Sequence, residues 1–247
     1  MEEKVKLAKD STAPLVDAMS YRSIVGTLRY LTHKRPDIGF AVGYVSRFMA
    51  EPQEDHLAAV KHLLRYVAGT RDYGLVYPRR SRGKLELIGF SDSDMAGDVD
   101  GRRSTTGVLF FLGACPISWQ SMKQKVVALI TCVAEYIAAA TACCQGVWLG
   151  RLLAELTGEE ARAPVLMVDN QFAIALAKNP VHHDRSKNID TKYHFIHDCV
   201  DGGQIRLEYV KTARQLGDIL TKPLGRIRLT ELRTKIGVEE IKQEQCN

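Results

Sequence analysis

Two aspartates follow short apolar runs that are typical of buried β-strands, a position from which a carboxylate can do chemistry. Asp92 ends the run that begins at Leu85, and Asp169 directly follows Val165-Leu-Met-Val. In open α/β sheets, ligands bind at the carboxyl ends of the strands, so two such aspartates can share one site. An Asp after a strand also often caps the next helix, and for Asp169 the sequence leaves both interpretations open.

Glu135 lies in a stretch whose helical face is otherwise small and apolar. The other residues of that face are Ala138, Ala139, Ala142, Gly146 and Leu149. A carboxylate on such a face loses its hydration unless a cation or a hydrogen-bond donor meets it. The alternative is an exposed first helical turn, where an acid interacts favourably with the helix dipole. The sequence does not decide between a buried and an exposed Glu135.

Histidines and cysteines are the other side chains that commonly bind metals. His182, His183, His194 and His197 cluster, but their spacing matches no common zinc pattern, which favours a structural role. The six cysteines are scattered without a CxxC pair, as is typical of reduced thiols in an intracellular protein, cytoplasmic or nuclear. No secretory signal is apparent, and the apolar window 126–150 predicts a buried helix rather than a membrane span.

The formal net charge of +5 is unevenly placed along the chain. The first 83 residues hold 14 Lys and Arg against 9 Asp and Glu. A local basic cluster at the end of this part consists of Arg79, Arg80, Arg82 and the adjoining Lys84. A basic segment suits a partner that carries phosphates, such as a nucleic acid. A solvated linker without any partner explains the cluster equally well.

The elements that must position these residues separate into two regions. From Tyr21 to about Gly69, apolar residues recur at helical spacing, and Pro36 and Pro52 lie where helices would begin. This pattern predicts three short helices. The Gly-, Pro- and Arg-rich tract that follows predicts a linker.

After the linker, the pattern changes to strands that alternate with helices. We expect strands over 85–90, 108–112, 116–119, 165–168 and 205–210, the second and third joined as a hairpin at Gly113-Ala114. Helices are expected over 131–155, 171–177, 189–200 and 213–220, the last of them ended by Pro223. This order predicts an α/β fold, a mixed sheet with helices on its faces.

Ten motifs occur in one order from about Tyr21 to Val238, nearly the whole chain. They are Tyr21-Arg-Ser-Ile-Val-Gly-Thr-Leu-Arg-Tyr-Leu, Arg35-Pro-Asp-Ile, Ser91-Asp-Ser-Asp-Met-Ala-Gly-Asp, Arg103-Ser-Thr-Thr-Gly, Ser118-Trp, Lys123-Gln-Lys, Ala134-Glu-Tyr, Val168-Asp-Asn, Arg185-Ser-Lys-Asn-Ile-Asp and Asp218-Ile-Leu-Thr-Lys-Pro-Leu. Together they resemble the C-terminal part of the Pol polyprotein of copia-type retrotransposons, of the kind found in plants. The resemblance implies a ribonuclease H-like mixed five-stranded sheet with flanking helices, preceded by a small all-helical segment.

The resemblance also implies how the chain is divided. Residues 1–20 are expected to be a flexible segment, and residues 21–70 to correspond to the thumb or connection region of a reverse transcriptase. After these come a linker over 71–84, a ribonuclease H domain over 85–225 and a C-terminal helix or tail over 226–247.

Carried over position by position, the ribonuclease H tetrad falls on Asp92, Glu135, Asp169 and Asp218, the last through the resemblance alone. Asp94 is a less certain neighbour of the site. The implied activity is hydrolysis of the RNA strand of RNA–DNA hybrids with two Mg²⁺ ions, for which Mn²⁺ can substitute. Asp92 would bridge the ions, Glu135 and Asp169 would hold one, and Asp218 the other.

Contacts to nucleic acid are expected from polar residues near these acids. The candidates are Arg102, Arg103, Ser104, Thr105, Lys123, Lys125 and Asn170. Phosphate contacts of this kind position a duplex without reading its sequence. Ordinary exposed turn residues are an equally good interpretation of any one of them.

Two departures leave a rival hypothesis open. Ile130 and Val133 stand where the family pattern has a small polar residue and a second acid. No Tyr-Val-Asp-Asp polymerase motif occurs, so we expect no polymerase activity from this chain and a polymerase domain as a possible partner. The rival hypothesis is a catalytically silent nucleic-acid-binding or protein-interaction module.

Overall fold

The computed structural model describes residues 6–77, 86–160, 162–178 and 187–241. The predicted three helices of the first region are present as α1 (Ala18–Leu31), α2 (Gly39–Val45) and α3 (Glu54–Gly69), with the short 3-10 helices η1 (Pro36–Ile38) and η2 (Ser46–Phe48) between them. Asp17 caps α1 through Met19 and Ser20, and Pro36 occupies the first turn of η1. The apolar faces of these helices meet in a core of their own.

A five-stranded sheet forms the centre of the second region. Its strands are β2 (Leu87–Ser93), β3 (Thr105–Leu112), β4 (Cys115–Lys123), β5 (Val165–Val168) and β6 (Arg206–Tyr209), in the order β4-β3-β2-β5-β6. β2, β3 and β4 pair antiparallel, whereas β5 pairs parallel to both β2 and β6. The predicted hairpin joins β3 to β4, and Gly113 in its turn has a φ of 59°. This mixed sheet confirms the predicted ribonuclease H-like fold class.

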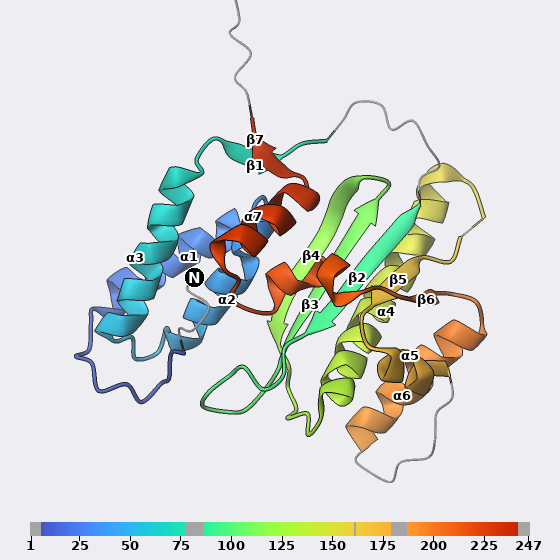
Figure 1. Ribbon diagram of the computed structural model, residues 1–247, viewed down its shortest axis with the longest axis horizontal. Coiled ribbons are helices and arrows are strands. Elements are labelled where there is room, and N and C mark those ends of the chain that lie inside the picture. The colour runs from blue at the N-terminus through green and yellow to red at the C-terminus, as the bar shows by residue number, and fades with distance from the viewer. Residues whose placement is uncertain (1–5, 78–85, 161, 179–186, 242–247) are drawn as a thin grey trace, which may run out of the picture.

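Helices cover both faces of the sheet (Figure 1). On one face, α4 (Thr131–Thr157), α5 (Gln171–Lys178) and α6 (Lys187–Asp201) enclose the largest apolar core. On the other face, η4 (Gly217–Leu220) and α7 (Arg226–Lys235) pack against β3. The helical first region lies on that side too, where α2 contacts β4.

The predicted helix over 213–220 is wrong. The chain there forms two short 3-10 helices, η3 (Thr212–Arg214) and η4, with an extended Gln215 between them. The buried Gln215 side chain donates to Ser91 O at 2.9 Å and accepts from Gly217 N at 3.0 Å. A Cβ at Gly217 would lie 2.7 Å from the Asp92 Cβ. Close packing on β2 therefore overrides the amphipathic pattern of this segment.

The segments that were predicted to be linkers or flexible ends make tertiary contacts. In the predicted linker, β1 (Tyr73–Leu75) pairs antiparallel with β7 (Val238–Glu240), close to the C-terminal end of the chain. In the N-terminal segment, Leu7 is buried, and Val16 N donates to Pro52 O at 3.0 Å. The predicted domain boundaries themselves stay a prediction.

Within the described residues, α4 alone is long and apolar enough to cross a membrane, judged by length and composition. One side of α4 is packed against the sheet, and its buried residues include Glu135 and Tyr136. The expected buried helix over 131–155 is thus present, with slightly wider bounds.

Candidate functional site

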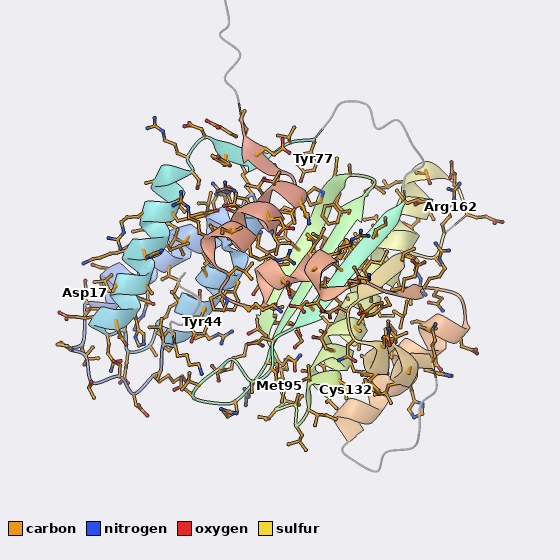
Figure 2. The ribbon with its side chains drawn as sticks, viewed as in Figure 1. Asp17, Tyr44, Tyr77, Met95, Cys132 and Arg162 are labelled. Carbon is orange, nitrogen blue, oxygen red and sulfur yellow. The ribbon has the colours of Figure 1, made fainter. Side chains whose placement is uncertain are left out.

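Asp92 and Asp169 lie side by side because β2 and β5 are parallel neighbours. The register pairs Ser91 with Val168, so the two aspartates follow at the same end of the sheet. The loop after β2, marked by Met95, and the start of α4, marked by Cys132, lie at that end (Figure 2). This is the carboxyl end of the parallel strands, where α/β proteins bind ligands.

Glu135 reaches the same place from the N-terminal part of α4, just after its first turn. It is only 4% exposed, which excludes the exposed-turn interpretation. Ser93 N donates to Glu135 Oε1 at 3.3 Å, whereas Oε2 is buried without a hydrogen-bond partner in the described part of the chain. Oxygen atoms of Asp92, Glu135 and Asp169 all lie within 4.8 Å of one another.

The residue that caps the helix after β5 is Asn170 and not Asp169. Asn170 Oδ1 accepts from Ala173 N at 3.0 Å and so caps α5. Asp169 is left free to face Asp92 and Glu135. Three converging carboxylates with an unpartnered buried oxygen form an all-oxygen donor set, which is compatible with a hard divalent cation.

The protonation of these acids reflects burial and mutual repulsion. Burial, followed by the charges of Asp92 and Asp169, raises the pKa of Glu135 to about 9. Burial raises the pKa of Asp92 to about 6, with Asp218 and Asp169 adding to the rise and Lys222 opposing it. Burial also raises the pKa of Asp169. Without a cation, the group therefore retains protons at neutral pH.

This protonation makes the stability of the metal-free protein depend on pH. Between the ordinary pKa of 4.5 and about 9, the folded state binds a proton on Glu135 that the unfolded state does not, so stability falls as pH rises. Glu135→Gln stays neutral throughout. We expect it to raise the free energy of unfolding at pH 8 by roughly 4 kcal/mol, and at pH 5 by less than about 1 kcal/mol.

Thermal unfolding in EDTA across pH 5–9 measures this effect. Glu155→Gln on the exposed side of the same helix is the matched control and should leave the pH profile unchanged. A Glu135→Gln profile parallel to that of wild type would contradict the assigned burial of the charge.

Asp218 lies next to this group but is not one of the three converging carboxylates. Its Oδ1 pairs with Lys222 Nζ at 2.6 Å, and its Oδ2 pairs with Arg228 Nη2 at 3.2 Å. Lys222 Nζ is also 3.6 Å from Asp92 Oδ2, an oxygen that accepts the Thr221 hydroxyl as well. Lys222 and Arg228 were missed in the sequence, although Lys222 falls four residues after Asp218 within the last motif.

Asp94 organises the loop that follows β2. It accepts from Thr105 N, and burial raises its pKa to about 6. Arg47 from the helical region reaches the same loop, with Nη2 donating to Thr105 Oγ1 at 3.0 Å and Nη1 lying 3.4 Å from Asp98. Asp94 thus supports the loop beside the site, outside the converging group.

The seven predicted nucleic-acid contacts fall into different environments. Arg102, Arg103 and Lys125 are exposed, and Lys123 Nζ pairs with Asp98 at 2.6 Å. Ser104 and Thr105 are buried, and Ser104 Oγ accepts from Ala96 N inside the loop. In this structure, therefore, Ser104 and Thr105 are not exposed turn residues, and Asn170 has the capping role described above. A contact of these residues with nucleic acid stays a prediction.

The histidine cluster gives no metal site among the residues that the structure describes. His194 is exposed, and His197 Nδ1 lies 3.6 Å from Asp198. His182 and His183 lie outside the described residues.

A groove of about 550 Å³ separates the helical region from the edge strand β4. Its lining includes the basic residues Arg29, Arg47 and Lys123 together with His33, and no acid. Asp92, Gly107 and Ser121 stand in register across β2, β3 and β4, and Ser121 lines the groove. Two strand spacings therefore separate the groove from Asp92, roughly 10 Å.

Two curated relatives cover nearly the whole chain. The retrovirus-related Pol polyproteins from transposon RE1 of Arabidopsis thaliana and from transposon TNT 1-94 of Nicotiana tabacum are 43% and 41% identical to it, over 98% and 96% of its length. The matched parts are 16% and 17% of those relatives, so the chain spans about a sixth of their length. No protein-family model matches the chain.

Solved structures resemble the chain in fold. The foamy viral protease-reverse transcriptase in complex with an RNA/DNA hybrid matches with a TM-score of 0.54 at 11% identity, covering 87% of this chain and 27% of that one. The N-terminal RNase H domain of a Mycobacterium tuberculosis protein matches with a TM-score of 0.40 at 13% identity, covering 61% of this chain and 97% of that one.

Proposed function

Since the chain belongs to the family of retrovirus-related Pol polyproteins of transposons, we propose that its ribonuclease H-like domain hydrolyses the RNA strand of RNA–DNA hybrids with Mg²⁺. The observation that carries the proposal is the convergence of Asp92, Glu135 and Asp169, with a buried Glu135 oxygen left unpartnered. Buried carboxylates in proteins are normally paired with a cation or a hydrogen-bond donor. A bound divalent cation would supply the positive charge that this group of three carboxylates needs.

Each residue of the group has a role in this proposal. Asp92, Glu135 and Asp169 would hold a divalent cation, and Glu135 would release its proton as the cation binds. Divalent cations held by these carboxylates would supply an activated water and positive charge for the reacting phosphate. Ser93 N orients Glu135, and Asn170 fixes the start of α5 beside Asp169.

The substrate class is inferred from charge and from the family. Arg102 and Arg103 are exposed in the loop between β2 and β3, and Lys125 is exposed between β4 and α4. The groove beside β4 adds the basic residues Arg29, Arg47 and Lys123. These residues suit phosphate contacts. Selection of RNA–DNA hybrids would come from the 2′-hydroxyl groups of one strand and the shape of the other.

The proposal extends to partners and location. A polymerase domain of a reverse transcriptase is the proposed partner, because the relatives are Pol polyproteins and the chain spans a sixth of them. A cytoplasmic or nuclear location accords with cysteines that form no disulfide among the described residues, such as Cys115, Cys132, Cys143 and Cys199.

Cleavage of a labelled hybrid by the purified chain tests the activity. We expect RNA fragments with 5′-phosphate ends in Mg²⁺ or Mn²⁺, no product in EDTA, and no cleavage of a DNA duplex of the same sequence. Tight hybrid binding without any product in either metal would contradict the enzyme and favour the catalytically silent module.

A further inference from the structure

Both oxygens of Asp218 are already occupied by cationic side chains. Lys222 Nζ lies 2.6 Å from Oδ1, and Arg228 Nη2 lies 3.2 Å from Oδ2. The Asp218 side chain is 7% exposed, so little water competes for these oxygens. Each oxygen of Asp218 therefore faces a cationic side chain, although Oδ1 is buried without a hydrogen bond in the described part of the chain.

Lys222 also reaches the carboxylate group itself. Its ammonium is 3.6 Å from Asp92 Oδ2, and so lies between Asp92 and Asp218. The local backbone places it there, because the glycine at 217 allows η4 to pack directly on Asp92. Because η4 is a short helical turn, Lys222, four residues after Asp218, lies on the same side of this segment as Asp218.

The charges of this neighbourhood balance with a single divalent cation. Asp92, Glu135, Asp169 and Asp218 carry four negative charges when ionised, and Lys222 and Arg228 supply two positive ones. The surrounding charges cancel in pairs: Glu231 with Lys235, and Asp94 and Asp98 with Arg47 and Lys123. One divalent cation neutralises the remainder, whereas a second would have to enter against the Lys222 ammonium.

We propose that the free protein binds one divalent cation, at Asp92, Glu135 and Asp169, and that the Lys222 ammonium occupies the place of a second cation between Asp92 and Asp218. This inference rests on the proposed function for the existence of the first site. A substrate phosphate would add the negative charge that a second cation needs, and Lys222 would then be free to move away from Asp92 and Asp218.

Titration of the nucleic-acid-free protein with Mn²⁺ tests the proposal without measuring cleavage. Free Mn²⁺ is followed by electron paramagnetic resonance, and heats of binding by calorimetry. Wild type should bind one ion. Lys222→Met should gain a second ion with an affinity at least about tenfold above any second binding step of wild type, because Asp218 Oδ1 and Asp92 Oδ2 lose their shared ammonium.

The chain offers a closely matched control. Lys235 pairs with Glu231 at 2.6 Å, also four residues apart, but away from the carboxylate group. Lys235→Met should leave one ion bound. Lys222→Arg retains a cation and should bind one ion too, and Asp169→Asn should lose the first ion.

The outcomes separate this inference from the proposed function. Two equivalent ions in wild type, or a single ion in a folded Lys222→Met, would overturn the role of Lys222 and leave the metal-dependent nuclease standing. No bound Mn²⁺ in wild type would overturn both. Circular dichroism verifies folding, and a misfolded Lys222→Met is replaced by Lys222→Gln with the same expected second ion.

Discussion

Asp92→Asn is expected to lower the rate of RNA cleavage in a hybrid at least about a hundredfold. Asp92 is the most buried acid of the converging group and lies next to both Glu135 and Asp169. The amide keeps the size of the side chain but removes the charge that would hold a cation. A bound metal contributes several kcal/mol of transition-state stabilisation, and each 1.4 kcal/mol is about tenfold in rate.

Single-turnover cleavage in Mg²⁺ measures this loss and separates chemistry from product release. Asp201→Asn, an exposed acid at the end of α6, is the control and should cleave at the rate of wild type. Hybrid affinity should change little in Asp92→Asn, because the basic surface is untouched. Cleavage by Asp92→Asn within about threefold of wild type would show that the carboxylate is not needed.

Asp37→Ala is expected to destabilise the protein by about 3–5 kcal/mol, the range found when one partner of a buried ion pair is removed. The Asp37 side chain is 0% exposed and accepts two bonds from Arg35, at 2.9 and 2.7 Å. It also accepts from Tyr66 Oη at 2.7 Å. The substitution leaves the Arg35 charge buried, with hydrogen bonds to Thr70 remaining.

Urea unfolding followed by circular dichroism measures the loss, and the melting temperature should fall by roughly 6–20 °C for a chain of this size. The matched control is Asp72→Ala, whose pair with Arg71 is exposed, and which should cost less than about 1 kcal/mol. A loss below 1 kcal/mol in Asp37→Ala would show that the ion pair contributes little.

Hydrogen bonds around Tyr66 also connect the helical first region to the C-terminal helix α7. Arg233 of α7 donates to Tyr66 Oη at 3.2 Å and lies over the Tyr73 ring, 4.2 Å from its centroid. Trp119 Nε1 of β4 donates to Thr32 O at 2.8 Å. The helical region thus contacts both the sheet and α7, and it places Arg47 against the loop beside the site.

The order of elements and the strand-end acids could be predicted from the sequence. Short apolar runs predict which segments are strands. An acid that directly follows such a run lies at the carboxyl end of its strand, where α/β sheets bind ligands. Asp92 and Asp169 were predicted on that ground, and the small apolar face of Glu135 correctly raised the question of burial. These signals are local, because each depends on a few neighbouring residues within one strand or one helix.

Only the tertiary structure decided which charges meet. Asp218 was expected to be a metal ligand through the family resemblance alone, and the structure pairs its two oxygens with Lys222 and Arg228. Ser104 and Thr105 resemble exposed turn residues but are buried in the loop that Asp94 and Arg47 support. Segment 213–220 has a helical pattern, but a 3-10 helix packs closer to β2. The pair of Asp218 with Lys222 is local in sequence, but the contact of Lys222 with Asp92 is not. The physical reason common to all three is burial, which depends on the approach of segments far apart in sequence and is encoded in no local pattern.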